Sequence, residues 1–171
     1  MRKYRVPRHD VTQPLDPSIK LIPLTRGLNA IVDAADYEWL NQWNWFALQS
    51  QHNSYAARLD KKTSRLILMH RLIVGGNSQD IDHINRNPLD NRRSNLRPCT
   101  RAENLYNQPK HKNNSSGFKG VYWDKTHGYW KAEIRNNGPR IRLGYFRTKE
   151  AAFKAYCEAC KKLHGEFGRT S

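Results

Sequence analysis

The residues best suited to chemistry lie in the stretch 81–107, where acid, histidine and amide side chains recur at short spacing. Asp82 is followed directly by His83, and a polar loop, Asn85–Ser94, separates this pair from Asn95. A histidine with its ordinary pKa of about 6.5 can take a proton from water at neutral pH. Hard divalent cations prefer carboxylate and amide oxygens. Phosphodiester hydrolysis needs such groups, because it requires an activated water and charge relief on the phosphate.

Short apolar segments predict the elements that would position the Asp-His pair. Isoleucines flank the pair and predict a short strand, and the run 95–97 predicts a second strand. Thr100 followed by Glu103 is a capping box, which predicts a helix that must end before Pro109. The expected local order is strand, long loop, strand, helix. Adjacent strand residues point to opposite faces, so the pair serves one site only if the strand ends or twists there.

The predicted helix carries two amides three residues apart, which lie on one face. The oxygen donors near the pair then belong to Asp82, Asn91, Asn95, Asn104 and Asn107. The simpler interpretation is a surface dipeptide surrounded by ordinary loop asparagines. Two amides on a capped helix favour a metal-dependent centre over that interpretation.

The charge balance indicates a polyanionic partner. Lys and Arg number 30 against 15 for Asp and Glu, which gives a formal net charge of +15. Cations that neutralise phosphates release counterions, so this excess favours nucleic acid. A generally basic protein and a membrane-surface protein are the alternatives.

The cysteines and the hydropathy exclude several classes of protein. Cys99, Cys157 and Cys160 are too few and too badly spaced for a disulfide framework or a four-ligand zinc site. No apolar run approaches the roughly 20 residues of a membrane span, and no secretory signal is visible. We expect a cytoplasmic protein without a membrane partner, and a monomer is the favoured state.

Two further segments flank the central stretch. Residues 1–19 predict a basic arm, either lying along DNA or disordered, and residues 20–70 predict a small β-rich unit in which Asp33 caps a short helix. Polar stretches at 50–54 and 60–64 predict hairpin turns. We expect the aromatic residues of this unit to pack in its core rather than stack on bases.

The C-terminal part has a different pattern, after a polar linker at 109–116. Three runs, 118–123, 129–135 and 141–146, predict strands, and Thr148 predicts the start of a helix. One apolar face is expected on that helix, formed by Ala152, Phe153, Tyr156, Ala159, Cys160 and Leu163.

Residues 20–110 resemble the HNH endonucleases with a ββα-metal motif, particularly phage and intron homing enzymes. The resemblance is carried by His70-Arg71, Asp82-His83, 91–97 and Glu103-Asn104 with Asn107. It implies His83 as general base, Asp82 and Asn104 as metal ligands, and Asn95 as the residue that ties the loop and orients His83. Asn107 is the rival ligand, and His70 is either a phosphate contact or, as we favour, a packed residue.

This sequence departs from the family name in its last letter, since Asn stands where the pattern has His. One magnesium ion, with manganese as the alternative, suits such oxygen donors better than zinc does.

Residues 117–167 resemble the plant ethylene-response-factor (APETALA-type) DNA-binding domain. The matching residues include 118–121, 130–135, 143–146 and 148–152. The resemblance implies a three-stranded antiparallel sheet on one helix, with the sheet in the major groove of double-stranded DNA. It implies DNA contacts at Lys119, Tyr122, Glu133, Arg135, Arg140, Arg142 and Tyr145. Tyr122, Asp124 and Arg142 depart from the usual pattern, so no target sequence transfers.

The sequence thus predicts an α+β protein with a basic arm at 1–19, an HNH nuclease domain at 20–108, a linker at 109–116 and a DNA-binding domain at 117–171. The expected function is metal-dependent, site-specific cutting of DNA. A non-catalytic DNA-binding regulator with a vestigial nuclease fold is the alternative, and RNA binding or cutting is a weaker one.

Overall fold

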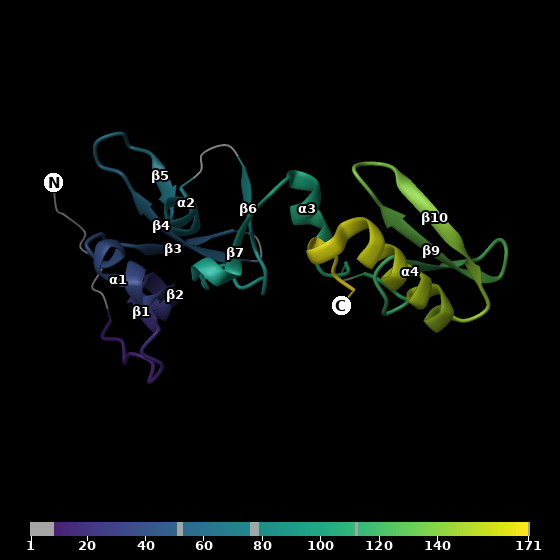
Figure 1. The fold of residues 1–171 in the computed structure, drawn as a ribbon, viewed down its shortest axis with the longest axis horizontal. Coiled ribbons are helices and arrows are strands. Elements are labelled where there is room, and N and C mark those ends of the chain that lie inside the picture. Colours follow the sequence, from purple (N-terminus) through teal and green to yellow (C-terminus); the bar gives the residue numbers. More distant parts are fainter. Residues whose placement is uncertain (1–8, 51–52, 76–78, 112, 171) are drawn as a thin grey trace. The chain divides into compact units, whose positions relative to one another are not determined.

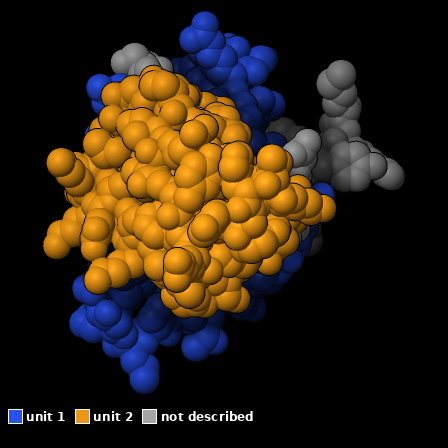
Figure 2. Space-filling view, turned by 90° about the vertical axis from the view of Figure 1, so that its right-hand side faces the viewer, with its two compact units in different colours: residues 1–98 blue, residues 99–171 orange. Residues whose placement is uncertain are grey.

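The computed structural model describes residues 9–50, 53–75, 79–111 and 113–170. The chain divides into two compact units, residues 1–98 and 99–171 (Figure 2). Both helices and strands are present in an α+β arrangement, as predicted (Figure 1). No helix within the described ranges has the length and apolar character needed to cross a bilayer.

Within the described residues, the first unit contains three small sheets, two α-helices and two short 3₁₀ helices, Thr25–Gly27 and Arg93–Asn95. Its elements, in order, are β1 (Ile19–Pro23), β2 (Asn29–Asp33), α1 (Ala34–Asn41), β3 (Phe46–Gln49), β4 (Ser54–Leu59), β5 (Leu66–Leu68), α2 (Met69–Val74), β6 (Asp80–His83) and β7 (Leu96–Cys99). The strands pair as β1-β2, β3-β4-β5 and β6-β7. The predicted turns at 50–54 and 60–64 join antiparallel strands of the second sheet, although residues 51–52 lie outside the described residues.

One apolar core holds this unit together. Ile22, Val32, Leu40 and Met69 are fully buried in it, and Trp45 is only 3% exposed. These side chains come from the β1–β2 hairpin, both α-helices and the segment before β3, so burial of a shared apolar surface fixes their arrangement. Trp45 was expected to pack rather than stack on bases, and its place in the core confirms that expectation.

Two details of the N-terminal part differ from the simplest expectation. Residues 1–8 of the predicted arm lie outside the described residues, while Gln13 exchanges two hydrogen bonds with the Leu21 backbone on β1. Helix α1 begins directly after Asp33, as predicted, but the Asp33 side chain makes no capping hydrogen bond. Its carboxylate instead accepts a hydrogen bond from the backbone N–H of Arg93, at 2.7 Å.

The second unit contains α3 (Arg101–Tyr106), β8 (Val121–Asp124), β9 (Tyr129–Arg135), β10 (Arg140–Phe146) and α4 (Lys149–His164). The three strands form an antiparallel sheet in the order β10-β9-β8. Helix α4 packs on one face of this sheet (Figure 1). The Thr148 hydroxyl caps α4 by accepting from the Ala151 N–H at 3.2 Å, and the predicted apolar helix face forms the core.

Candidate nuclease centre and DNA-binding face

Asp82 and His83 occupy the last two positions of β6, and both side chains are buried, at 5% and 7% exposure. The strand ends at His83, where Arg86 takes a left-handed φ of 62° and donates its N–H to the His83 carbonyl. Adjacent residues within a strand point to opposite faces, so Asp82 and His83 can serve one site only if the strand ends or twists beside them. The end of β6 at His83 meets this condition.

Arg97, on β7, forms an ion pair with Asp82. Its Nε and Nη2 atoms donate to the same carboxylate oxygen of Asp82, at 2.9 and 2.7 Å. The two side chains are only 12% and 6% exposed. A charge-assisted pair in such a dry position holds the carboxylate in one orientation.

Asn95 closes the loop that joins β6 to β7. Its side-chain carbonyl accepts from the Asn85 N–H at 2.9 Å, and its amide donates to the Asp90 carbonyl at 2.8 Å. The start and the middle of the loop are therefore both tied to Asn95 at its far end. The resemblance implied that Asn95 ties this loop, and the two hydrogen bonds have that geometry.

Asp90 organises the middle of the same loop. Its buried carboxylate accepts a two-pronged pair of hydrogen bonds from Arg92, at 2.8 and 2.6 Å, and one from the Asn85 amide at 2.7 Å. These hydrogen bonds offset the effect of burial and hold the pKa of Asp90 below its usual value. The Asn91 N–H also donates to Ile31 on β2, which anchors the loop to the core.

The His83 ring lies among aromatic neighbours. Its centroid is 5.0 Å from that of His70, in an edge-on contact, and 6.4 Å from that of Tyr55. Burial lowers the pKa of His83, while the negative charges of Asp82 and Asp90 oppose that change. A lowered pKa keeps the imidazole neutral at neutral pH, which is the form that can accept a proton.

Helix α3 carries the remaining predicted ligand. Its capping box is formed as expected: the Thr100 N–H donates to the Glu103 carboxylate at 2.7 Å, and the Glu103 N–H donates to the Thr100 hydroxyl at 3.2 Å. Asn104 is partly exposed, whereas Asn107 is buried. Asp82, His83 and Asn95 belong to the first unit, and Asn104 belongs to the second.

The donor chemistry fits a hard cation better than zinc. Asp82 and Asn104 offer carboxylate and amide oxygens, which magnesium and manganese accept. Within the described residues, no group of three or more His, Cys, Asp or Glu side chains could hold a metal ion. The three cysteines are free thiols, of which Cys99 and Cys160 are buried.

Six of the seven predicted DNA contacts share one face of the C-terminal sheet. The strand register pairs Tyr122 and Tyr145 with Lys131, Glu133 with Arg142, and Arg135 with Arg140. Paired residues point to the same side, and the intervening Val121, Ala132 and Ile134 are buried on the other side. A register shift between Arg142 and Gly144 returns Tyr145 to the exposed face.

This face is strongly cationic. It carries Lys131, Arg135, Arg140 and Arg142 against Glu133, which lies 3.0 Å from Lys131 and 3.7 Å from Arg140. The Arg142 guanidinium lies 5.5 Å from the centre of the Tyr145 ring. A face with this charge and exposed aromatic rings suits a polyanion.

Lys119, the seventh predicted contact, is bound elsewhere. Its ammonium group donates to the backbone carbonyls of Tyr106 and Gln108, at 2.7 and 2.6 Å, at the end of α3. Lys119 thus holds the end of the helix, and its predicted contact with DNA stays a prediction.

Sequence reasoning did not single out three of these residues for the part they play. Arg97 holds Asp82, Asp90 organises the loop, and Lys131 completes the exposed sheet face. Lys131 could have been found from its alternation with Glu133 and Arg135. No local pattern signals the pairing of Arg97 with Asp82, since it depends on the register of two strands.

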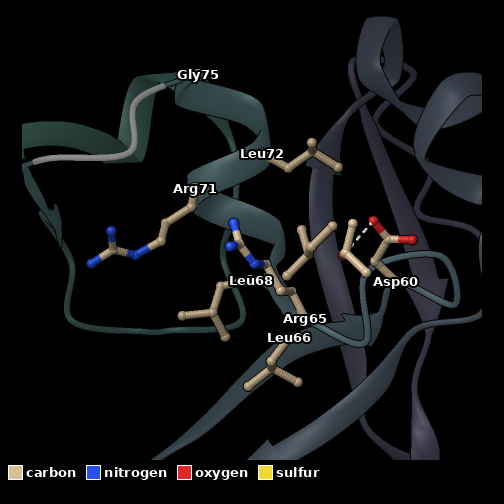
Figure 3. A pocket seen from close by; sticks show the side chains of 9 residues that line it. Asp60, Arg65, Leu66, Leu68, Arg71, Leu72 and Gly75 are labelled. Atoms are coloured by element: carbon tan, nitrogen blue, oxygen red, sulfur yellow. Dashed lines mark hydrogen bonds between the residues drawn. The ribbon is translucent and has the colours of Figure 1, made fainter.

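A shallow pocket lies between the β4–β5 turn and α2. Figure 3 shows Asp60, Arg65 and Arg71 at this pocket, together with leucines of β5 and α2. Neither Asp82 nor His83 lines it, so we assign it no part in the chemistry described above.

The comparisons with known proteins agree with this division. A model of HNH endonucleases matches residues 77–106, and a model of the AP2 domain matches residues 116–166. Protein 3.8 of Escherichia phage T7 is 34% identical over 89 residues, which cover 52% of this chain and 73% of that protein. An uncharacterized HNH endonuclease of Acanthamoeba polyphaga mimivirus is 30% identical over 144 residues, covering 83% of this chain and 74% of that protein.

The likeness to plant proteins is confined to a shorter part of the chain. Dehydration-responsive element-binding protein 2A of Arabidopsis thaliana is 42% identical over 59 residues, 33% of this chain and 17% of that protein. No solved structure matches. The length and identity of the mimivirus match, together with the two family models, show that this chain belongs to the HNH endonuclease family and carries a C-terminal AP2 domain.

Proposed function

We propose that the protein is a metal-dependent, site-specific DNA endonuclease of the homing type. The observation that carries the proposal is the buried Asp82-His83 pair at the end of β6, followed directly by a loop that Asn95 closes. This arrangement lies within the segment that matches the HNH endonucleases. A nuclease domain at 20–108 would then include α3, and the DNA-binding domain would occupy 117–171.

In this proposal His83 removes a proton from the attacking water. Burial keeps the ring neutral at neutral pH, and the neutral ring has a free electron pair with which to accept the proton. Asp82 and Asn104 would hold one divalent cation, magnesium or manganese, which relieves charge on the phosphate and the leaving oxygen. Arg97 keeps the Asp82 carboxylate in place, and Asn95 keeps the loop after His83 closed.

The AP2 domain would choose the DNA site. Its exposed sheet face, with Arg135, Arg140 and Arg142 beside Tyr122 and Tyr145, is suited to the major groove of double-stranded DNA, which admits a β-ribbon. A single chain carries both functions in this proposal, so a monomer is sufficient.

One observation favours a second candidate, a DNA-binding regulator that does not cut. The positively charged guanidinium of Arg97 already pairs with the Asp82 carboxylate, with Nη2 at 2.7 Å from its oxygen. If that pair never yields to a divalent cation, the HNH fold serves only as a scaffold.

Supercoiled plasmid incubated with magnesium or with a chelator distinguishes these candidates. The proposal predicts conversion to nicked or linear plasmid with magnesium and none with chelator. Plasmid that is bound in both conditions but stays supercoiled would overturn the proposal in favour of the regulator. Sequencing the cut ends then identifies the target site.

A further inference from the structure

The ring of His83 has two ring neighbours, Tyr55 on β4 and His70 on α2. The ring centroid of Tyr55 lies 6.4 Å from that of His83 and 5.8 Å from that of His70, and the two imidazoles are 5.0 Å apart. We call Tyr55, His70 and His83 the three-ring cluster. All three residues belong to the first unit, so the geometry of the cluster is complete within residues 1–98.

Strand β4 directs Tyr55 toward this cluster. Successive side chains of a strand point to opposite faces. Ala56 belongs to the apolar core, so Tyr55 lies on the other face of the sheet, the one that the two imidazoles approach. Strand β4 is the central strand of its sheet, paired with β3 and with β5. A side chain on such a strand is held more precisely than one on a loop.

The three rings differ in how much of each reaches solvent. His70 and His83 are 5% and 7% exposed, whereas Tyr55 is only partly buried. Among the residues that the structure describes, Nδ1 of His70 is buried without a hydrogen-bond partner. His70 therefore supports its neighbours by packing. The Tyr55 hydroxyl makes no hydrogen bond within the same residues and is not buried, so a bound molecule can reach it.

The distance from Tyr55 to His83 suits a shared substrate. A general base lies about 3 Å from the water that it activates, and that water lies roughly 3–3.5 Å from the atom that it attacks. The phosphate attacked by a water on His83 would thus lie roughly 6 Å from the base. This length is close to the 6.4 Å between the two rings. A hydroxyl that projects from the Tyr55 ring can therefore reach a phosphate oxygen at the usual distance of about 2.7 Å.

We propose that Tyr55 is a further catalytic residue, whose hydroxyl donates a hydrogen bond to a non-bridging oxygen of the scissile phosphate. The inference rests on the proposed function, because it takes the phosphodiester beside His83 as the substrate. Negative charge builds on that oxygen as water attacks, and a donor already in place stabilises the charge. The hydroxyl keeps its proton throughout, so no bond is made or broken at Tyr55.

Tyr55→Phe tests the proposal, because it keeps the ring packed on His70 and His83 and removes only the hydroxyl. Single-turnover cleavage of plasmid with magnesium should slow by roughly 10- to 100-fold, the usual effect of losing a hydrogen bond to a charged oxygen. Plasmid affinity in chelator and the urea midpoint of unfolding should stay at the parental values. The matched control is Tyr37→Phe, which removes a hydroxyl that accepts from Asn41 on α1 and should cut at the parental rate.

A second measurement identifies the phosphate oxygen as the partner. A duplex that spans the sequenced cut site carries sulfur in place of one non-bridging oxygen of the scissile phosphate, in each of the two configurations. Sulfur accepts hydrogen bonds weakly. The factor by which Tyr55→Phe slows cutting should therefore fall below about threefold in one configuration and persist in the other, as expected for two groups in contact. An equal factor in the unmodified duplex and in both sulfur duplexes would overturn the contact.

The outcomes separate this inference from the proposed function. A parent protein that cuts plasmid, combined with a Tyr55→Phe protein that cuts at the same rate, would overturn the inference alone. Slower cutting accompanied by a lower urea midpoint, and by an equal factor in the sulfur duplexes, would reduce Tyr55 to a packing residue. Failure of the parent to cut plasmid would overturn the inference and the proposed function together.

Discussion

Gly120 is the residue at which the second unit leaves least room for a side chain. It has a left-handed φ of 74°, and an added Cβ would lie 2.2 Å from the Tyr156 ring and 2.7 Å from the Glu133 carbonyl. Overpacking and backbone strain should together destabilise a Gly120→Ala variant by roughly 2–4 kcal/mol.

Chemical denaturation followed by tryptophan fluorescence measures this loss. Gly128→Ala is the matched control, because Gly128 has a similar φ of 68° with no atom within 4 Å of the added Cβ. It should lose only about 1 kcal/mol, the cost of the strain. Equal losses in the two variants would show that the contact with Tyr156 has no effect.

His70 makes the first unit sensitive to pH. Burial, with the nearby His83 and Arg71, lowers its pKa to about 3 in the folded chain. The unfolded chain binds a proton near pH 6.5 and the folded chain does not, so stability is full above that pH and falls as pH decreases toward 3. Below about pH 6 the loss contributed by His70 approaches 1.4 kcal/mol per pH unit.

Urea unfolding between pH 5 and about pH 7 measures this slope, in a range where most carboxylates stay ionised. His70→Asn should flatten the slope by the contribution of about one proton. The control is His127→Asn, whose side chain is 60% exposed. A slope unchanged by His70→Asn would show that His70 is protonated equally in both states.

At the scale of elements, the β6–β7 loop behaves as one structure because Asn95 joins its ends. Asn95→Ala leaves the Asn85 N–H and the Asp90 carbonyl without that partner, and it should destabilise the first unit by roughly 1–3 kcal/mol. Amide hydrogen exchange of the 84–94 peptide should become faster, and so should exchange of the Ile31 N–H that donates to Leu89 in the loop, while exchange in β3 and β4 changes little.

Asn53→Ala, at an exposed position just before β4, is the control for this loop. It should leave exchange in the 84–94 peptide unaltered. If Asn95→Ala also leaves that exchange unaltered, the loop is held by Asp90 and Arg92 alone.

The elements also show what the sequence could predict. The capping box at Thr100 and the strands of the C-terminal sheet follow from local patterns, because each depends on neighbouring residues. The register shift after Arg142 and the pairing of Asp33 with the Arg93 N–H depend on contacts between distant segments. No spacing rule within one segment contains that information.

At the scale of the whole molecule, the net charge of +15 supplies a general attraction to DNA. The cationic face of the C-terminal sheet should make most of the phosphate contacts. The double variant Arg135→Gln/Arg140→Gln should weaken binding and lower the slope of log affinity against log salt by about 1–2, since each phosphate contact contributes roughly 0.9. Fluorescence anisotropy with a labelled duplex measures both quantities.

The control for this prediction removes two exposed charges from α4, in Lys154→Gln/Lys161→Gln. Because the net charge changes equally, this variant should keep nearly the full slope. Identical slopes in the two double variants would mean that the sheet face is not the DNA-binding surface.

The measurement that tests the central claim most directly is single-turnover cleavage of plasmid by His83→Ala, with protein in excess and magnesium present. Loss of the general base should lower the cleavage rate by roughly 10²–10⁴-fold while plasmid binding is unchanged. The control His127→Ala should cut at the parental rate. A His83→Ala protein that cuts as fast as the parent would contradict the account, because the proton would then be taken by another group.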